Sequence, residues 1–450
     1  MTAQRRPAAS EGRRAALRAR LETERGRRLD LAFEEAAAGL DARERAFARE
    51  LAYGVTRLRG RLDHLIGLRV RRGLGALDPE LREALRLGAY QLLYMGGVPA
   101  YAAVSQAVEQ ARAGAGPGAA KLANAVLRRV GEAGDAPELF PRFETDPAGF
   151  LASWGSHPAW LVERWLARWP AAEVRALVEA NNGRPALHLV PLDVDLAEAA
   201  EALRASGIAS EPVGEGTRCL RVDEGTPPAA ALAALPHAVV QDPAANLVVA
   251  YADVPEGTKV ADVCAAPGGK ALALADRSVY TLAADRSESR LRIMRENVRR
   301  TERRVGLVVA DGRRPPLAAA DVVLLDVPCT ATGTLRRRPD ARWRVGPDAL
   351  RELTALQREL LEASAELVPP GGLLVYSTCS LEREENEDQA DAFLTRHPDF
   401  ELAPTGAVPA RHLDAAGRLV VTPQATGFDG SFAARFRRRG YESEVNRRSA

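Results

Sequence analysis

The sequence predicts a multidomain protein that combines an all-helical part with mixed α and β parts. A chain of 450 residues is too long for a single hydrophobic core. Apolar side chains recur at helical spacing up to about residue 135, whereas helices alternate with short apolar runs beyond about residue 240. We therefore expect a helical domain over residues 1–140, a small α+β module over 150–238 and a doubly wound α/β domain over 239–440.

The helical domain carries a basic surface. Within residues 1–130 the sequence has 24 Lys and Arg against 14 Asp and Glu, an excess of 10. This excess favours a polyanionic partner, although a solvated helix surface explains it equally well. Asp41 and Asp78 stand where helix N-caps are expected, and Pro79 fits the first turn of the second of these helices. The first ~20 residues form a basic arm that we expect to be disordered.

The overall composition excludes several classes of protein. Hydrophobic residues make up 46% of the chain and charged residues 27%, which is ordinary for a globular protein. No apolar run reaches the ~18 residues needed to span a bilayer, and the charged N-terminus lacks the apolar core of a signal peptide. Four cysteines without a CxxC pattern argue against a disulfide framework and a metal site. The sequence therefore predicts a cytoplasmic protein with no membrane anchor and no bound metal.

Five short apolar runs mark the strands of the α/β domain: TKVADVC, VYTLAAD, GLVVAD, DVVLLDVP and GGLLVYST. Each run ends in or beside Asp or Cys, and the carboxyl ends of parallel strands meet at one edge of the sheet. The first run leads into a small-residue loop in which Gly268 and Gly269 allow close approach of a ligand to the backbone. This loop is neither a GxGxxG nor a Walker A motif, and a plain strand-to-helix turn is the alternative.

Acidic residues close the next two strands. Asp285 ends the second strand, 21 positions after Cys264, where nucleotide-binding folds place a carboxylate on the ribose hydroxyls. Asp311 closes the third strand and is expected beside an adenine. A helix N-cap and an Asp-Gly turn are the respective alternatives. An adenosine ligand without a phosphate grip fits S-adenosylmethionine (SAM) better than NAD or ATP.

Two cysteines end the fourth and fifth strands. Asp326, Val327, Pro328 and Cys329 form a run in which the proline must take the chain out of the sheet. Cys379 ends the next strand, which should be a neighbour, so both thiols are expected at the edge that holds the cofactor loop. A free cysteine is more often a buried hydrophobe than a nucleophile, but two at such positions favour a shared catalytic role.

Thiols beside a methyl donor indicate covalent catalysis on a pyrimidine. Carbon 5 of cytosine is scarcely nucleophilic until a thiolate adds to carbon 6, after which carbon 5 accepts a methyl group. Asp326 is placed to stabilise this adduct near N3 and N4 of the base. Lys270 is one of only three lysines among 62 basic residues, and we expect it to support charge at the cofactor loop or to lower a thiol pKa.

Several motifs resemble one protein family. The sequences DVCAAPGGK, DVPCTATG, RRRPDARW and VYSTCS resemble the RNA 5-methylcytosine methyltransferases of the RsmB/NOL1/NSUN group. LRLGAYQLLYMGGVPAYAAVSQAVEQA and KLANAVLRRV resemble the NusB-like RNA-binding domain that precedes the catalytic domain in its bacterial members. The resemblance implies a NusB-like bundle, a ferredoxin- or RRM-like RNA-binding module and a class I Rossmann-like SAM methyltransferase domain. It covers most of residues 40–440, and the basic arm has no clear counterpart.

The same resemblance implies a function and assigns the site. The substrate would be a cytosine of 16S ribosomal RNA, in free RNA or a partly assembled small subunit, and the enzyme would act as a monomer. Cys379 would form the adduct with carbon 6, and Cys329 would assist product release. Cofactor contacts would fall on Cys264, Ala265, Ala266, Pro267, Gly268, Gly269, Lys270, Asp285, Asp311 and Asp326.

The sequence leaves two departures from the family pattern and two alternative functions open. Pro243, Ala244 and Ser431 differ from the residues usual in the family, which puts fine RNA contacts in doubt. An amino methyltransferase is one alternative, because Asp-Val-Pro-Cys loosely resembles the Asp-Pro-Pro-aromatic loop of those enzymes. A non-catalytic RNA-binding assembly factor is the other. Neither alternative requires the pair of thiols.

Overall fold

The computed structural model describes residues 10–440, and the chain divides into two compact units. Unit 1 comprises Met1–Gly183 and Leu335–Gly346, and unit 2 comprises Arg184–Thr334 and Pro347–Ala450. The segment Leu335–Gly346, which the sequence assigns to the third domain, therefore packs within unit 1. The domain boundaries drawn from the sequence remain predictions, and the frayed tail expected after the last strand lies outside the described residues.

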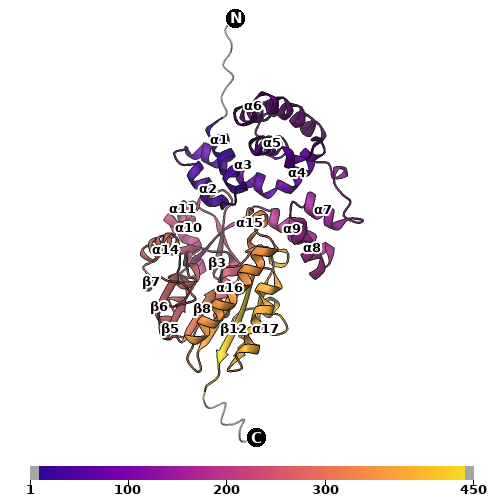
Figure 1. Ribbon diagram of the computed structural model, residues 1–450. Coiled ribbons are helices and arrows are strands. Elements are labelled where there is room, and N and C mark those ends of the chain that lie inside the picture. Colours follow the sequence, from indigo (N-terminus) through magenta and orange to yellow (C-terminus); the bar gives the residue numbers. More distant parts are fainter. Residues whose placement is uncertain (1–9, 441–450) are drawn as a thin grey trace. The chain divides into compact units, whose positions relative to one another are not determined.

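Unit 1 is helical throughout its described residues (Figure 1). Asp41 and Asp78 cap their helices as predicted, accepting hydrogen bonds from the backbone N–H groups of Glu44 and Glu80. The α-helices are α1 (Glu11–Glu24), α2 (Leu29–Ala36), α3 (Ala42–Arg57), α4 (Arg59–Gly67), α5 (Pro79–Tyr94), α6 (Ala100–Ala133), α7 (Pro147–Ser153), α8 (Ala159–Arg168), α9 (Ala171–Asn182) and α15 (Ala341–Arg344).

The N-terminal arm is a correction to the sequence prediction. Residues 11–20, expected to be disordered, belong to α1, whose N-cap Ser10 accepts a hydrogen bond from the backbone N–H of Arg13. Ala15, Ala16 and Ala19 form a stripe on α1 that is completely buried in the core of unit 1. The run RRAALRARLETERGRR has apolar and charged residues at helical spacing, so the pattern did predict a helix here, and only the expected disorder of the arm was wrong. Residues 1–9 lie outside the described part of the chain.

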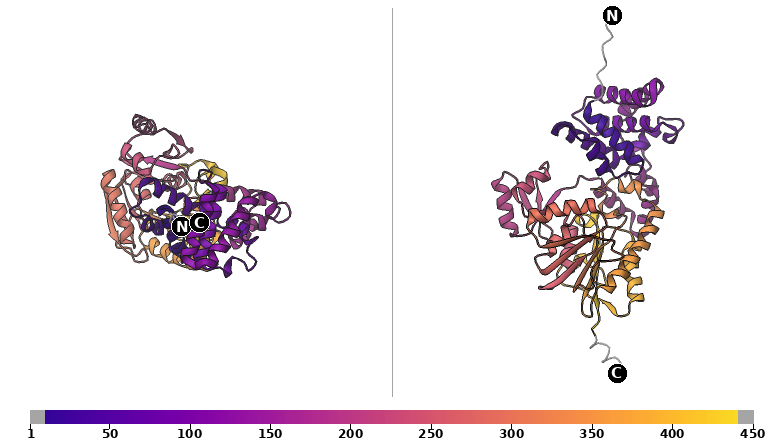
Figure 2. Two further views of the ribbon diagram at one scale, coloured as in Figure 1. Left: turned by 90° about the horizontal axis from the view of Figure 1, so that it is seen from above. Right: turned by 60° about the vertical axis from the view of Figure 1, so that its left-hand side comes forward.

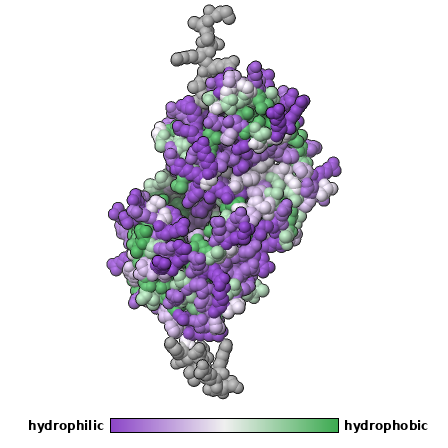
Figure 3. Space-filling view, viewed as in Figure 1, coloured by the Kyte–Doolittle hydropathy of each residue, from purple (hydrophilic) through white to green (hydrophobic). Residues whose placement is uncertain are grey.

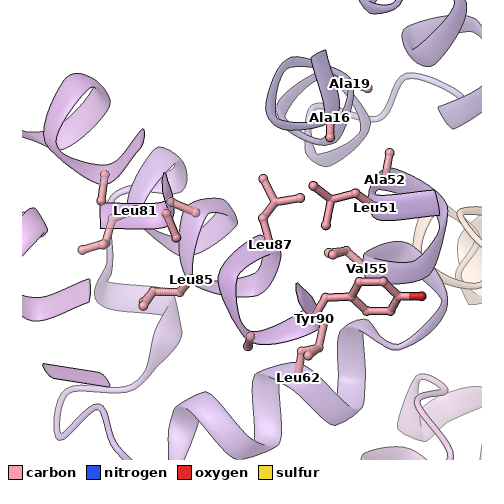
Figure 4. Packing of buried hydrophobic residues seen from close by; sticks show 14 of the residues in the cluster. Ala16, Ala19, Leu51, Ala52, Val55, Leu62, Leu81, Leu85, Leu87 and Tyr90 are labelled. Carbon is pink, nitrogen blue, oxygen red and sulfur yellow. The ribbon is translucent and has the colours of Figure 1, made fainter. Parts of the chain in front are cut away.

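The core of unit 1 forms where α3 meets α5 (Figure 4). Leu51 and Val55 of α3 point toward Leu87 and Tyr90 of α5, and all four are buried. Gly54 permits this approach, because a Cβ there would lie 2.1 Å from the Tyr90 ring. The close contact explains a glycine in the middle of a helix, where it otherwise costs stability.

Arg342 of α15 anchors Leu335–Gly346 in unit 1. Its guanidinium is buried and donates to Asn182 Oδ1 at 2.8 Å and to the carbonyl oxygens of Ser156 and Asn181, both at 3.1 Å. Burial lowers the pKa of Arg342 to about 9. Through these neutral acceptors, Arg342 of the RRRPDARW motif ties α15 to the rest of unit 1.

Unit 2 begins with a small module of four antiparallel strands and two helices. The strand order is β2-β3-β1-β4, and β1 pairs with both β3 and β4. The elements are β1 (Leu187–Pro191), α10 (Leu196–Ala205), β2 (Ser210–Val213), β3 (Cys219–Val222), α11 (Pro228–Ala234) and β4 (Ala238–Val240). Helices packed on one such sheet confirm the predicted α+β class.

The larger sheet of unit 2 has eight strands in the order β10-β12-β9-β8-β5-β6-β7, with β11 paired to β12 (Figure 2). The strands β9, β8, β5, β6 and β7 are parallel, and β12 is antiparallel to β9. The bounds are β5 (Thr258–Asp262), β6 (Ser278–Asp285), β7 (Val305–Val309), β8 (Val322–Asp326), β9 (Leu373–Thr378), β10 (Phe400–Leu402), β11 (Leu419–Val421) and β12 (Ser431–Arg438). All five predicted strands and the predicted neighbours β8 and β9 are confirmed.

Helices cover both faces of this sheet. Val323 and Leu325 pack with α16 and α17 on the face at the front of Figure 1, whereas Val322 and Leu324 pack with α12 and α13 on the other. These helices and the remaining ones are α12 (Pro243–Ala252), α13 (Gly269–Leu274), α14 (Glu288–Thr301), α16 (Pro347–Glu366), α17 (Glu387–Arg396) and α18 (Pro423–Thr426). The order of strands reverses between β5 and β8, which is where open α/β sheets bind their ligands.

The surface agrees with the composition. Figure 3 shows hydrophilic residues predominating on the face in view, with hydrophobic residues in small groups. None of the helices within residues 10–440 combines the length and the apolar character needed to cross a bilayer.

Candidate active site

The predicted cofactor loop follows β5 and leads into α13. The backbone N–H of Ala265 donates to the carbonyl of Ala284 at 2.9 Å, which ties the loop to β6. Gly268 has φ of 103°, and a Cβ at this position would lie 2.7 Å from Met294 Cγ. Only glycine fits such a backbone and such a contact. Glycine at position 268 is therefore explained by its backbone conformation and by its packing against Met294, and the approach of a ligand to this loop stays a prediction.

The carboxylate of Asp285 lies directly against this loop. It accepts hydrogen bonds from the backbone N–H groups of Ala266 at 3.1 Å and Ser287 at 2.8 Å. Arg290 of α14 donates to both of its oxygens, at 2.9 and 3.0 Å. The side chain of Asp285 is only 2% exposed. The place of Asp285 beside the ribose of SAM stays a prediction, and Arg290 is a contact that the sequence did not indicate.

Asp311 lies two residues beyond β7, whose last residue Val309 pairs with Asp285. Its carboxylate is partly exposed and bonds to Arg313. Hydrogen bonds from Arg313 lower the pKa of Asp311 to about 2. The structure thus brings Asp311 to the same sheet edge as Asp285, and its place beside an adenine stays a prediction.

Asp262 is a site residue that the sequence reasoning missed. It ends β5, is 1% exposed and accepts a long hydrogen bond of 3.4 Å from the backbone N–H of Cys264. Burial, and then the charge of Asp326, raise the pKa of Asp262 to about 8. The signal was present, because Asp262 closes the first strand of the VADVC run just as Asp285 and Asp326 close theirs.

Lys270 and Asp326 form an ion pair. Lys270 Nζ donates to Asp326 Oδ2 at 2.7 Å, and Ser377 Oγ donates to Asp326 Oδ1 at 2.8 Å. Burial alone lowers the pKa of Lys270, but the charge and hydrogen bond of Asp326, together with the charges of Cys379 and Asp262, outweigh it and the net shift is upward. The Asp326 side chain keeps 33% of its surface exposed, so it remains accessible to a base.

The two thiols lie in contact. Cys329 Sγ and Cys379 Sγ are 3.3 Å apart, and neither cysteine forms a disulfide. The loops that carry them are joined by two backbone bonds: Val327 N–H donates to the Ser377 carbonyl, and Gly333 N–H donates to the Cys379 carbonyl, each at 3.0 Å. The hydrogen bond with Cys379, and then burial, raise the pKa of Cys329 well above its ordinary value.

A buried polar cluster surrounds the thiol loops and was also missed. Glu385 is completely buried and accepts hydrogen bonds from the backbone N–H of Thr330 and from Gln357 Nε2, both at 2.9 Å. Ser380 Oγ lies 3.0 Å from Thr330 Oγ1. Glu385 stands in the acid-rich run EREENEDQ, which reads as a solvated helix start. No pattern in the sequence distinguishes it from its exposed neighbours.

Comparisons with known proteins agree with this arrangement. Residues 249–437 match the model of the 16S rRNA methyltransferase RsmB/F family, residues 10–132 match the NusB family, and residues 157–228 match the ferredoxin-like domain of RsmF/B-like methyltransferases. The NusB match thus extends into the N-terminal arm, for which the sequence indicated no counterpart.

Individual relatives match over most of their length. A Synechocystis protein named "Probable ribosomal RNA small subunit methyltransferase B" is 35% identical, over 88% of this chain and 91% of its own. The ribosomal RNA small subunit methyltransferase B of Serratia proteamaculans is 33% identical, over 81% of this chain and 85% of its own. The crystal structure of PH0851 superposes with a TM-score of 0.77 at 26% identity, covering 96% of this chain and 100% of that one.

Proposed function

Because the chain belongs to the RsmB/F family of SAM-dependent 16S ribosomal RNA methyltransferases, we propose that it forms 5-methylcytosine in small-subunit ribosomal RNA. The observation that supports this chemistry most directly is the pair of thiols, Cys329 and Cys379, 3.3 Å apart at the ends of β8 and β9. Both stand beside Asp326, at the edge of the sheet that carries the cofactor loop. Methyl transfer to nitrogen or oxygen requires no such pair.

Cys379 is the nucleophile in this proposal. Its thiolate forms a bond to carbon 6 of the cytosine, and the electron pair of the C5–C6 double bond becomes available at carbon 5. SAM supplies an electrophilic methyl group when it is bound. Carbon 5 would take that methyl group as the bond between the methyl carbon and the sulfonium sulfur breaks and leaves its electron pair on that sulfur. Carbon 5 would then carry both the methyl group and its original hydrogen.

Asp326 and Lys270 act on the base. The Asp326 carboxylate is partly exposed, and by accepting a hydrogen bond from the N4 amino group, or from N3 once N3 is protonated, it would stabilise the charge that develops when the thiolate adds. The ion pair with Lys270 and the hydrogen bond from Ser377 fix the carboxylate before the base arrives. Fixed polar groups stabilise a transition state without reorganising during the reaction.

Cys329 assists product release. The proton on carbon 5 must pass to a base such as a water molecule, and its electron pair must restore the C5–C6 double bond. The bond between Cys379 and carbon 6 then breaks and returns its electron pair to the sulfur. Cys329 is in contact with Cys379 and lies on the neighbouring strand end, close to the atoms that change in this step. The assignment of the two roles comes from the family resemblance, and the contact between the thiols is compatible with it.

The helical domain and the α+β module would hold the RNA. The basic excess in residues 1–130 suits a phosphate backbone, and this part of the chain matches the NusB family. We propose 16S RNA in free or partly assembled form as the partner, and a monomeric enzyme acting in the cytoplasm. The affinity for RNA should then fall steeply with rising salt concentration, as measured by filter binding.

The first test replaces the proposed nucleophile. Cys379→Ala should transfer no methyl group from radiolabelled SAM to the RNA, since no thiolate activates carbon 5. Cys219→Ala is the matched control, because Cys219 is a free cysteine buried in β3, far along the chain from the proposed site. Substantial methylation by Cys379→Ala would favour an amino methyltransferase. Absence of methylation by the wild-type protein on any ribosomal RNA would favour an assembly factor.

The second test replaces the proposed release residue. Cys329→Ala should leave a covalent protein–RNA adduct that survives denaturing gel electrophoresis, because Cys379 still adds to carbon 6 but release is impaired. A fully active variant that traps no RNA would contradict the two-thiol mechanism. Bisulfite sequencing of ribosomal RNA from a deletion strain and its parent would then locate the modified cytosine.

A further inference from the structure

Glu385 is a buried carboxylate with neutral hydrogen-bond donors. It ends the short turn η4 (Arg383–Glu385) and has no exposed surface. Burying a carboxylate among neutral groups costs several kcal/mol unless hydrogen bonds satisfy it. Burial accordingly raises the pKa of Glu385, although hydrogen bonds from Ser380, Thr330 and Gln357 oppose the shift. Because burying Glu385 costs free energy, we infer that its carboxylate holds part of the structure in place.

Glu385 and Gln357 together hold the loop on the two sides of Cys329. Glu385 Oε1 accepts from the backbone N–H of Thr330 at 2.9 Å, and Oε2 bonds to the Thr330 hydroxyl. Gln357 Nε2 of α16 donates both to Glu385 Oε1 and to the carbonyl of Pro328, each at 2.9 Å. The residues before and after Cys329 are therefore fixed by one carboxylate–amide pair, and the cysteine has little freedom to move.

The same cluster fixes the loop that carries Cys379. Ser380 Oγ lies 3.0 Å from the hydroxyl of Thr330 and 3.2 Å from that of Thr332. Asn386, the residue after Glu385, donates from Nδ2 to the Ser380 carbonyl at 2.9 Å. Thr330, Thr332 and Ser380, which follow the two cysteines, therefore belong to one hydrogen-bonded network. Among these contacts, Glu385 supplies the only carboxylate.

We propose that Glu385 is a positioning residue that holds Cys329 in place for the release of methylated RNA. This inference rests on the proposed function, because it assigns Cys329 to release. The backbone of Cys379 is also held directly, because its carbonyl accepts a hydrogen bond from the Gly333 N–H. The backbone on both sides of Cys329 is held through Glu385 and Gln357. Loss of Glu385 should therefore disturb Cys329 more than Cys379. The charge of Glu385 also contributes, after Cys379 and burial, to the raised pKa of Cys329.

The test measures trapped RNA instead of activity alone. Glu385→Ala should still add Cys379 to RNA but release it slowly, so the fraction of protein in the denaturation-resistant adduct should exceed the wild-type fraction about tenfold or more, as expected for a displaced catalytic group. Glu385→Gln keeps an acceptor for the Thr330 N–H and should bring the adduct back to the wild-type fraction. Asp388→Asn, at an exposed carboxylate of α17 that pairs with Arg383, is the matched control.

A general structural role predicts a different result. If Glu385→Ala loses adduct formation and turnover together, or turns over as the wild type does, the positioning role is overturned. Cys329→Ala is run in parallel, and its failure to trap RNA would instead count against the proposed function. The rate at which diamide joins Cys329 and Cys379 into a disulfide, measured by mass spectrometry without RNA, decides independently of methylation. It should fall in Glu385→Ala and recover in Glu385→Gln, and an unchanged rate contradicts the proposal.

Discussion

Two glutamates, one in each unit, are completely buried and are treated in opposite ways. Glu83 of α5 lies between Arg20 and Arg86, with Arg20 Nε at 3.0 Å. Burial alone would raise the pKa of Glu83, but the two arginines outweigh it and lower the pKa to about 2. Glu385 has only neutral donors, and burial raises its pKa. In unit 1, two arginines neutralise the buried charge of Glu83, which favours stability. At the thiol site, only neutral groups donate to the buried carboxylate of Glu385, which we relate to the placement of Cys329.

The thiol site shares this property with the neighbouring cofactor loop. Asp262 is buried with a raised pKa, and its nearest acidic neighbour Asp326 is itself committed to Lys270. Carboxylates whose pKa is raised by burial are typical of functional sites, whereas carboxylates in ion pairs more often stabilise the structure. The comparison therefore predicts which substitutions damage stability and which change chemistry.

The largest effect on stability is expected from Glu83→Gln. The substitution removes one counter-charge from the buried Arg20 and Arg86, which keep Glu24 and, for Arg86, also Asp63. It should lower the free energy of unfolding of unit 1 by about 3 kcal/mol. All five tryptophans of the chain, at 154, 160, 165, 169 and 343, belong to unit 1. Urea unfolding followed by tryptophan fluorescence therefore reports on this unit.

A matched surface variant controls for this prediction. Glu35→Gln removes a 70% exposed carboxylate that pairs with Arg27, and it should change the free energy of unfolding by less than about 1 kcal/mol. Equal effects of Glu83→Gln and Glu35→Gln would mean that the buried ion pairs do not stabilise unit 1.

The next effect is a pH dependence caused by Asp262. Its pKa is about 8 in the folded protein and near its ordinary value of 3.8 in the unfolded chain. Between these values the folded state binds more protons, so the contribution of Asp262 to stability is present below about pH 4 and is lost as the pH rises toward 8. Asp262→Asn should therefore gain thermal stability relative to wild type between pH 5 and pH 8, as calorimetry would show. A constant difference across this range would contradict the raised pKa.

A smaller effect is expected from Glu385→Gln. The amide fills the same volume and still accepts from Thr330, while a buried charge disappears. The free energy of unfolding of unit 2 should change by less than about 1.5 kcal/mol, in contrast to Glu83→Gln. Hydrogen exchange of the β8 and β9 amides would measure this change. A loss of stability as large as that expected for Glu83→Gln would mean that both glutamates mainly stabilise the structure.

The smallest effect on stability is expected from Asp311→Asn, which breaks an exposed pair with Arg313. Exposed pairs contribute about 0–1 kcal/mol. If Asp311 lies beside the adenine, the affinity for SAM measured by calorimetry should fall while the melting temperature stays nearly constant. Unchanged affinity would remove Asp311 from the cofactor site.

The sequence predicted the parts of the site that strand ends define. Asp285, Asp326, Cys329 and Cys379 each close or follow an apolar run, and parallel strands bring such positions to one edge whatever the side chains do. Asp262 obeys the same rule and could have been found by it. The positions of these residues at the sheet edge follow from the topology of the sheet, which the spacing of apolar residues predicts.

The rest depends on contacts between distant segments. Glu385 is distinguished from its acidic neighbours only by its burial against Thr330 and Gln357, and nothing local encodes that burial. The packing of Leu335–Gly346 within unit 1 was missed for the same reason. The burial of Arg342 is explained only by the acceptors that surround it.

The identity of the residue that carries the RNA tests the central claim most directly. The adduct trapped by Cys329→Ala is digested with nuclease and protease, and mass spectrometry locates the remaining nucleotide. The division of roles between the thiols predicts a cytidine derivative on the peptide that contains Cys379, and no adduct in the Cys329→Ala/Cys379→Ala double variant. A nucleotide on any other residue, or an adduct that persists in the double variant, would contradict it.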